Sequence, residues 1–158
     1  MGIGSTWCSR VLTAGALAFA AVTPLSAQRA REWQVQGVAT VTADRYVGGG
    51  VGFGFRTNGR MRAAVAVSGG DLEGERALRP EVTASFHLNP YKQRGVSVYA
   101  GGGVAVVVTE DESREYILAL IGVEARPGAG AGWFAEVGVG GGLRIALGFR
   151  IRQRSPRR

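Results

Sequence analysis

A serine, a histidine and a glutamate that lie close together in the chain are the residues best suited to chemistry. Ser85 and His87, the only histidine, are two residues apart, and Glu81 precedes them. Side chains of these types act as nucleophile, base and orienting acid in hydrolases. Polar residues two apart are also routine on one face of a strand, because alternate residues share a face. We therefore interpret the three as polar lining and expect no catalytic residues.

We expect neither a metal nor a cofactor. The chain has one histidine and one cysteine, Cys8, so it lacks the ligand sets typical of zinc sites. The glycine-rich run 48–54 superficially resembles a phosphate-binding loop. However, no Lys-Ser/Thr pair and no helix follow it, and both are needed to hold a phosphate. The run is better interpreted as part of a strand.

Residues 1–27 have the order of a secretory signal peptide. Arg10 precedes an uncharged stretch, 11–22, and Leu25-Ser26-Ala27 supplies small residues before a cut. The apolar stretch is shorter than the roughly 20 residues of a membrane-spanning helix, which makes an N-terminal anchor the weaker alternative. Cleavage after Ala27 removes Cys8 and leaves one domain, residues 28–152, followed by a basic tail, 153–158.

The mature chain is made of segments in which apolar residues alternate with polar or very small ones. This period of two predicts strands, and turn residues such as Asn58-Gly59 separate them. Connections this short join antiparallel neighbours. The segments are 32–42, 46–56, 60–68, 81–88, 96–108, 115–125, 133–140 and 143–152.

The two faces of these segments differ in charge. The apolar face is nearly free of charge, whereas the other carries glycine, alanine, serine and threonine together with charged residues. The sixth segment is apolar on both faces, and we assign Ile117, Ala119, Ile121 and Val123 outward because this leaves Glu124 inside. We expect an internal network of ion pairs formed by Glu81, Glu124, Glu136, Arg62, Arg144 and Arg150.

This distribution favours a closed, up-and-down, antiparallel, all-β transmembrane barrel of about eight strands over a soluble one. A soluble barrel turns its charged face to water and should be rich in lysine there, but this chain has a single Lys, Lys92. Eight strands leave an interior that side chains can fill. Trp33, Phe55, Trp133 and Phe149 stand outward near segment ends, as interfacial aromatic residues do.

The closing pair of segments, GWFAEVGVGGGLRIALGFRIR, the signal peptide and the strand spacing resemble the small outer-membrane β-barrels of the OmpA-transmembrane-domain and OmpX type. The resemblance extends from Trp33 to Arg152. It implies a cell-outer-membrane location, contact with outer-membrane lipid and lipopolysaccharide, and insertion by the barrel-assembly machinery. Members of this family end on an aromatic residue, whereas this chain continues past Phe149 and Ile151 into residues 153–158.

The expected function is a structural or interaction role with a filled interior and no catalysis, and we expect a monomer. The alternatives are a lipid-A-modifying outer-membrane hydrolase, a narrow channel, and a soluble periplasmic lipocalin-like barrel. The net charge of +7 would suit nucleic acid, but the scattered basic residues and the export signal argue against that partner.

An even strand count puts both ends of the chain on the same side of the membrane, and export through the periplasm makes that side periplasmic. We then expect connections 43–45, 69–78, 109–114 and 140–142 outside. Two acidic groups lie in these connections, Asp71, Glu73 and Glu75 in one and Glu110, Asp111 and Glu112 in another. They face the medium as solvated charges, or alternatively hold divalent cations together with lipopolysaccharide.

Overall fold

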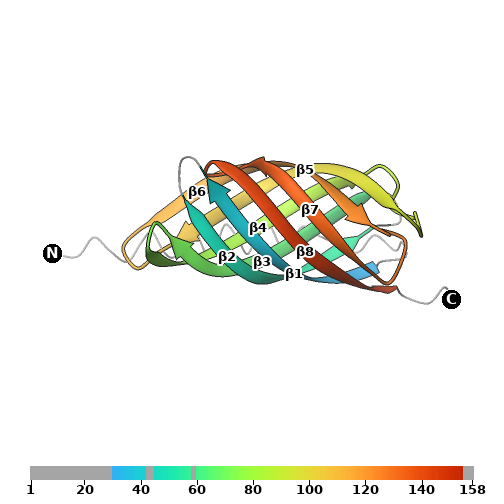
Figure 1. Cartoon of the computed structure of the whole chain (residues 1–158), viewed down its shortest axis with the longest axis horizontal. Helices are drawn as coiled ribbons and strands as arrows, with labels where there is room; N and C mark the ends of the chain where they lie inside the picture. The colour runs from blue at the N-terminus through green and yellow to red at the C-terminus, as the bar shows by residue number, and fades with distance from the viewer. Residues whose placement is uncertain (1–29, 42–44, 58–59, 155–158) are drawn as a thin grey trace.

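The computed structural model describes residues 30–41, 45–57 and 60–154, which form one closed barrel of eight antiparallel strands (Figure 1). Each strand pairs with the next in the chain, and the last pairs with the first. The strands are β1 (Ala30–Val41), β2 (Tyr46–Arg56), β3 (Met61–Leu72), β4 (Glu75–His87), β5 (Val96–Val108), β6 (Ser113–Ala125), β7 (Ala131–Val139) and β8 (Leu143–Arg154). This confirms the predicted all-β, up-and-down fold. No helix among the described residues is long and apolar enough to cross a membrane.

Side chains alternate between the inside and the outside of the barrel along every strand. In β6, which is apolar on both faces, Ile117 and Ile121 point outward and Glu124 is buried inside, as predicted. In β1, Trp33 and Val35 are exposed while Glu32 and Gln34 are buried. The alternation follows from the pleat of a strand, and closure of the sheet makes one face an interior.

The prediction was wrong about residues 69–78, which were expected to be a loop. Instead β3 runs to Leu72 and β4 begins at Glu75, and only Glu73 and Gly74, both with positive φ, form the turn. Pro80, a residue type that is rare inside strands, lies in this extended part of β4. Here it pairs with Val67 of β3, whereas the β4–β5 register omits residues 79 and 80. A proline is tolerated at such an interruption because it has no N–H to donate.

Inward-facing glycines make room for large side chains in the interior. A Cβ at Gly122 of β6 would lie 2.4 Å from the Tyr99 ring, and one at Gly148 of β8 would lie 2.6 Å from the ring of Phe134. Both rings are buried. The glycines that weaken ordinary strands therefore let aromatic rings lie against the barrel wall.

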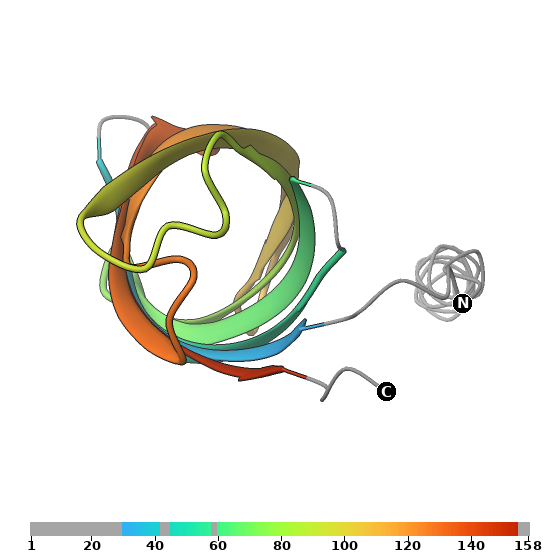
Figure 2. The same ribbon diagram turned by 90° about the vertical axis from the view of Figure 1, so that its right-hand side faces the viewer.

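We call the end of the barrel where β1 begins and β8 finishes the lower end, and the opposite end the upper end. Connections 88–95 and 126–130 lie at the lower end and curve over the opening (Figure 2). They are bonded to each other: the N–H of Gly128 donates to the carbonyl of Lys92 over 2.8 Å, and that of Arg126 to the carbonyl of Gly95 over 2.8 Å. The predicted Asn58-Gly59 turn and residues 43–44 lie outside the described residues.

Candidate functional site

The interior of the barrel is the candidate site, because it gathers charged side chains that are almost fully buried. Neighbouring strands supply them at alternate positions, so that each guanidinium meets carboxylates from other strands. Two groups of residues form. The lower cluster comprises Glu32, Arg56, Arg62, Glu124, Arg150 and Arg152, and the upper cluster comprises Arg79, Glu81, Glu136 and Arg144.

Glu32 of β1 is one of two carboxylates in the lower cluster. Its Oε1 lies 2.9 Å from Nε of Arg56 and 3.2 Å from Nε of Arg152. Its Oε2 accepts a 2.6 Å hydrogen bond from Nε of Arg62. Three strands besides its own, β2, β3 and β8, are thus joined through one side chain.

Glu124 of β6 is the second carboxylate of the lower cluster. It accepts hydrogen bonds from Nη2 of Arg56, over 2.9 Å, and from Nη2 of Arg152. Nη1 of Arg150 and Nδ1 of His87 each lie 3.4 Å from one of its oxygens. Four side chains from three other strands, β2, β4 and β8, surround this carboxylate, which is fully buried.

The upper cluster is bonded in the same way by two carboxylates. Glu81 accepts hydrogen bonds from Nε of Arg79 over 2.7 Å and from Nη2 of Arg144 over 2.9 Å. Glu136 accepts from Nη1 of Arg144 over 2.9 Å and from Nη2 of Arg150 over 3.0 Å. Glu136 therefore links the two clusters into one network.

Arg150 stands at the centre of this network. Its guanidinium lies 3.8 Å from the centroid of the Phe134 ring and 5.2 Å from that of Tyr99. It also donates to the Tyr99 hydroxyl over 3.2 Å and to Oε1 of Gln34 over 3.3 Å. A charge held between aromatic faces and acceptors fixes the planar guanidinium in place and fills the middle of the barrel.

Ser85, His87 and Glu81, the three residues with hydrolase chemistry, do not form one unit. Ser85 Oγ lies 3.3 Å from Nε2 of His87, but Glu81 bonds to Arg79 and Arg144 in the upper cluster. The acid beside His87 is Glu124. All of these side chains are buried, and the His87 ring stacks on Tyr99 with centroids 4.5 Å apart.

The predicted internal network is confirmed for its six named residues and is larger than expected. Alternation places Arg56 and Arg152 on the inner face of their segments as well, although the predicted network did not include them, and Glu32 and Arg79 were missed. Glu32 directly precedes the outward-facing Trp33, so alternation turns it inward. Arg79 lies two residues before the inward-facing Glu81 and therefore shares its face. Extending the period of two past Pro80 would have found Arg79.

Two of the acidic residues at the upper end have partners outside the interior network. Asp71 Oδ1 accepts a hydrogen bond from the N–H of Gly74 over 2.8 Å within the β3–β4 turn, and Glu112 pairs with Arg114. In the part of the chain that the structure describes, no group of three His, Cys, Asp or Glu side chains is arranged to hold a metal ion.

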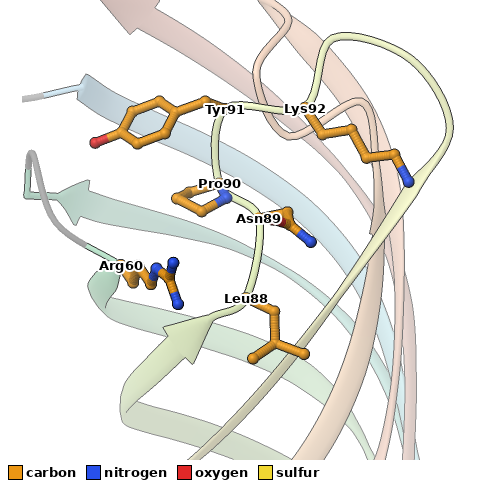
Figure 3. A pocket seen from close by; sticks show the side chains of 6 residues that line it. All are labelled: Arg60, Leu88, Asn89, Pro90, Tyr91 and Lys92. Atoms are coloured by element: carbon orange, nitrogen blue, oxygen red, sulfur yellow. The ribbon is translucent and has the colours of Figure 1, made fainter.

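A shallow hollow opens at the lower rim beside connection 88–95 (Figure 3). Arg60 lies at its edge with its guanidinium 5.9 Å from the Phe86 ring centroid, and Lys92 donates to the Val96 carbonyl over 3.0 Å. The lining residues are Arg60, Leu88, Asn89, Pro90, Tyr91 and Lys92. None of them belongs to the two clusters, so the hollow and the charged interior are separate features.

Comparison with known proteins identifies the architecture. The N-terminal β-barrel domain of Pseudomonas aeruginosa OprF aligns with 78% of this chain and 97% of its own, with a TM-score of 0.59 and 16% identity. Neisserial surface protein A (NspA) aligns with 78% of this chain and 96% of its own, with a TM-score of 0.52 and 12% identity. The chain has the fold of these small eight-stranded barrels. No model of a known protein family matches the sequence, and no curated protein does.

Proposed function

We propose that this chain is a small outer-membrane β-barrel with a structural or interaction role, a closed interior and no catalysis. The observation that carries the proposal is the polarity of the barrel: charged residues lie inside and apolar residues outside. Val35, Val51 and Leu147 are each about 60% or more exposed in the middle of their strands, whereas Arg144 and Arg150 are almost fully buried. Such a surface is stable against hydrocarbon and unfavourable in water.

The aromatic residues support a membrane-facing surface. Trp33, Phe55, Trp133 and Phe149 are all exposed and lie toward the lower end, where β1 and β7 begin and β2 and β8 approach their ends. Trp33 pairs across strands with Phe53, and Trp133 with Phe149. Side chains of this kind are typical of the boundary between lipid and water. We assign the lower end to the periplasmic interface. An even strand count puts both ends of the chain on one side, and the export predicted from residues 1–27 would make that side the periplasm.

The filled interior argues against a narrow channel. Arg150 lies between two aromatic rings at the centre, and connections 88–95 and 126–130 cross the lower opening. Nη1 of Arg152 donates to the carbonyl of Ala129 over 3.0 Å. This hydrogen bond links connection 126–130 to the lower cluster. We expect planar-bilayer recordings to show no stable single-channel conductance.

Burial argues against the lipid-A-modifying hydrolase. A nucleophilic serine must reach its substrate, but Ser85 is 5% exposed and lies beside His87, which is fully buried. Both lie near the lower end of β4, far from outer-leaflet lipid in the proposed orientation. Ser85→Ala and His87→Ala should leave lipid A acylation unchanged by mass spectrometry, and an altered acylation pattern would establish the hydrolase instead.

Heat-modifiability together with fractionation tests the proposal. The protein should be recovered with outer membranes, resist extraction by high salt, and migrate faster on a denaturing gel before boiling than after it. A soluble periplasmic barrel would be released without detergent. N-terminal sequencing of the membrane-extracted protein should begin at Gln28, and an intact Met1 on a cytosolic species would contradict the export step.

A further inference from the structure

The buried charges of the barrel interior do not balance. Among the described residues, six buried arginines face four buried glutamates, so the interior carries two excess positive charges when His87 is neutral. These residues are Arg56, Arg62, Arg79, Arg144, Arg150, Arg152, Glu32, Glu81, Glu124 and Glu136. Because the strands and the surrounding apolar surface keep water away, an uncompensated charge there is costly.

The excess lies in the lower half of the barrel. The upper cluster has two arginines and two glutamates and is balanced, whereas the lower cluster has four arginines on Glu32 and Glu124. Glu136 forms an ion pair with Arg150, but it also forms one with Arg144 of the upper cluster. Sharing a carboxylate between two guanidinium groups provides contacts to both without changing the sum of charges.

Unpartnered hydrogen-bond donors lie in the same place. Nη1 of Arg56 and Nη1 of Arg150 are buried and have no hydrogen-bond partner within the described chain. Both guanidinium groups pair with Glu124. Arg56 does so through Nη2, and Arg150 through Nη1 itself at 3.4 Å but without a hydrogen bond, so these donors belong to side chains gathered around one carboxylate. Water could accept these hydrogen bonds, but it would leave the two excess charges in place.

We propose that the lower cluster binds a small monovalent anion, such as chloride, between the guanidinium groups that surround Glu124. An anion supplies both missing elements, acceptors for the free donors and negative charge for the excess. It must be small because side chains fill an interior of eight strands. The inference concerns a ligand of the interior. Its unfolding test in vesicles rests on the proposed membrane barrel, whereas its crystallographic test does not.

Two neighbouring glutamines of β1 provide a matched test. Oε1 of Gln34 accepts from Nη2 of Arg62 over 2.7 Å and from Nε of Arg150 over 3.3 Å. Gln34→Glu therefore adds a negative charge beside two lower-cluster arginines without a change of shape. Gln36 is buried on the same strand, two residues further from the lower end, and accepts a hydrogen bond from Nε2 of Gln34 over 3.0 Å. Gln36→Glu is thus the control.

The experiment measures urea unfolding of the full chain in phosphatidylcholine vesicles, with gluconate replaced by chloride at constant ionic strength. If the folded protein binds one anion, the unfolding equilibrium constant should fall about tenfold for each tenfold rise of chloride above its Kd. Gln34→Glu should at least halve this slope on a logarithmic scale, and Gln36→Glu should keep it. A wild-type protein indifferent to chloride, or a slope that both variants lose equally, would overturn the proposal.

A second experiment detects the bound anion directly and needs no variant, so it still decides the proposal if the variants do not fold. Crystals of the unsubstituted protein grown in bromide should show an anomalous scattering peak in contact with the guanidinium groups of Arg56 and Arg150. An interior without such a peak would refute the anion site, whatever the variants do.

Discussion

Among single residues, Glu124 is the side chain on which most of the interior depends. It offers two oxygens to Arg56, Arg150, Arg152 and His87, and it is fully buried. Its removal would leave several guanidinium groups without their acceptor in a region already rich in positive charge. Breaking a buried ion pair on one side costs far more than the pair contributes net, because the remaining charge stays buried.

Glu124→Gln should therefore lower the free energy of unfolding by about 3–5 kcal/mol. The variant keeps the shape of the side chain, so the loss reflects charge. Urea unfolding in vesicles, followed by the heat-dependent gel shift, measures it. Glu112→Gln is the control, because Glu112 pairs with Arg114 while its side chain is 49% exposed, and there we expect a loss of under about 1 kcal/mol. Similar losses in the two variants would contradict the buried network.

The sequence predicts which residues enter the interior better than it predicts their partners. Glu81, Glu124, Glu136, Arg62, Arg144 and Arg150 were assigned inside from alternation alone, and all are buried. Glu81 was grouped with His87 because they are near in sequence, but it bonds Arg144, 63 residues away. Such pairings depend on how the strands are staggered around the closed barrel, and no local pattern encodes that.

At the scale of elements, alternation with period two is the signal that determines the strands. It correctly oriented even β6, where only Glu124 distinguishes the faces. It was not followed far enough before Glu81: residues 69–78 were expected to be a loop, but β4 already begins at Glu75. Proline and glycine are weaker evidence for a turn when a neighbouring strand pairs without interruption along that stretch. Here β3 pairs with β4 throughout, including Val67 with Pro80.

The aromatic rings that lie over inward-facing glycines lead to a second prediction. Gly122→Ala places a methyl group against the Tyr99 ring, whose hydroxyl donates to Glu136 over 2.8 Å, so the ring cannot move without disturbing the network. We expect a loss of about 1–3 kcal/mol in the free energy of unfolding. Gly69→Ala in β3 is the control, since nothing lies within 4 Å of its Cβ position. Equal stability of the two variants would show that the interior adapts freely.

For the whole molecule, the apolar outer surface and the charged interior make one arrangement that depends on lipid in our proposal. The exposed apolar side chains include Val51 at 63% and Leu147 at 60%, and the strand ends carry the charges that remain outside, such as Arg31 and Asp71. A charged residue in the middle of an outward-facing strand would be compatible with the stability of a soluble barrel. The same residue would lower the stability of a membrane barrel.

Val51→Lys distinguishes these cases. In a bilayer we expect a loss of about 2–4 kcal/mol in the free energy of unfolding, or failure to insert, because Val51 pairs with Val35 and Val67 in the middle of the outward face. Glu115→Lys, on an exposed residue near the upper end of β6, should have little effect. Unchanged folding of Val51→Lys in vesicles would argue against a lipid-facing surface.

Topology gives a further prediction. A tag inserted at Gly74, in the exposed two-residue turn between β3 and β4, should be readable on intact cells. A tag after Arg158 should be readable only once the outer membrane is breached, because the lower end faces the periplasm in our proposal. Protease added to intact cells should cut first in connection 109–112, since residues 69–72 and 75–78 are strand. The reverse accessibility of the two tags would invert the orientation.

The position of the arginines along the chain has a consequence for the order of events during folding. Arg144, Arg150 and Arg152 all belong to β8, the last strand to be synthesised, and both guanidinium partners of Glu136 are among them. Until β8 aligns between β7 and β1, Glu136 has neither arginine and Glu124 has only Arg56. Neutralisation of the acids therefore coincides with closure of the ring, and a chain that stops before β8 lacks both the closing strand and these arginines.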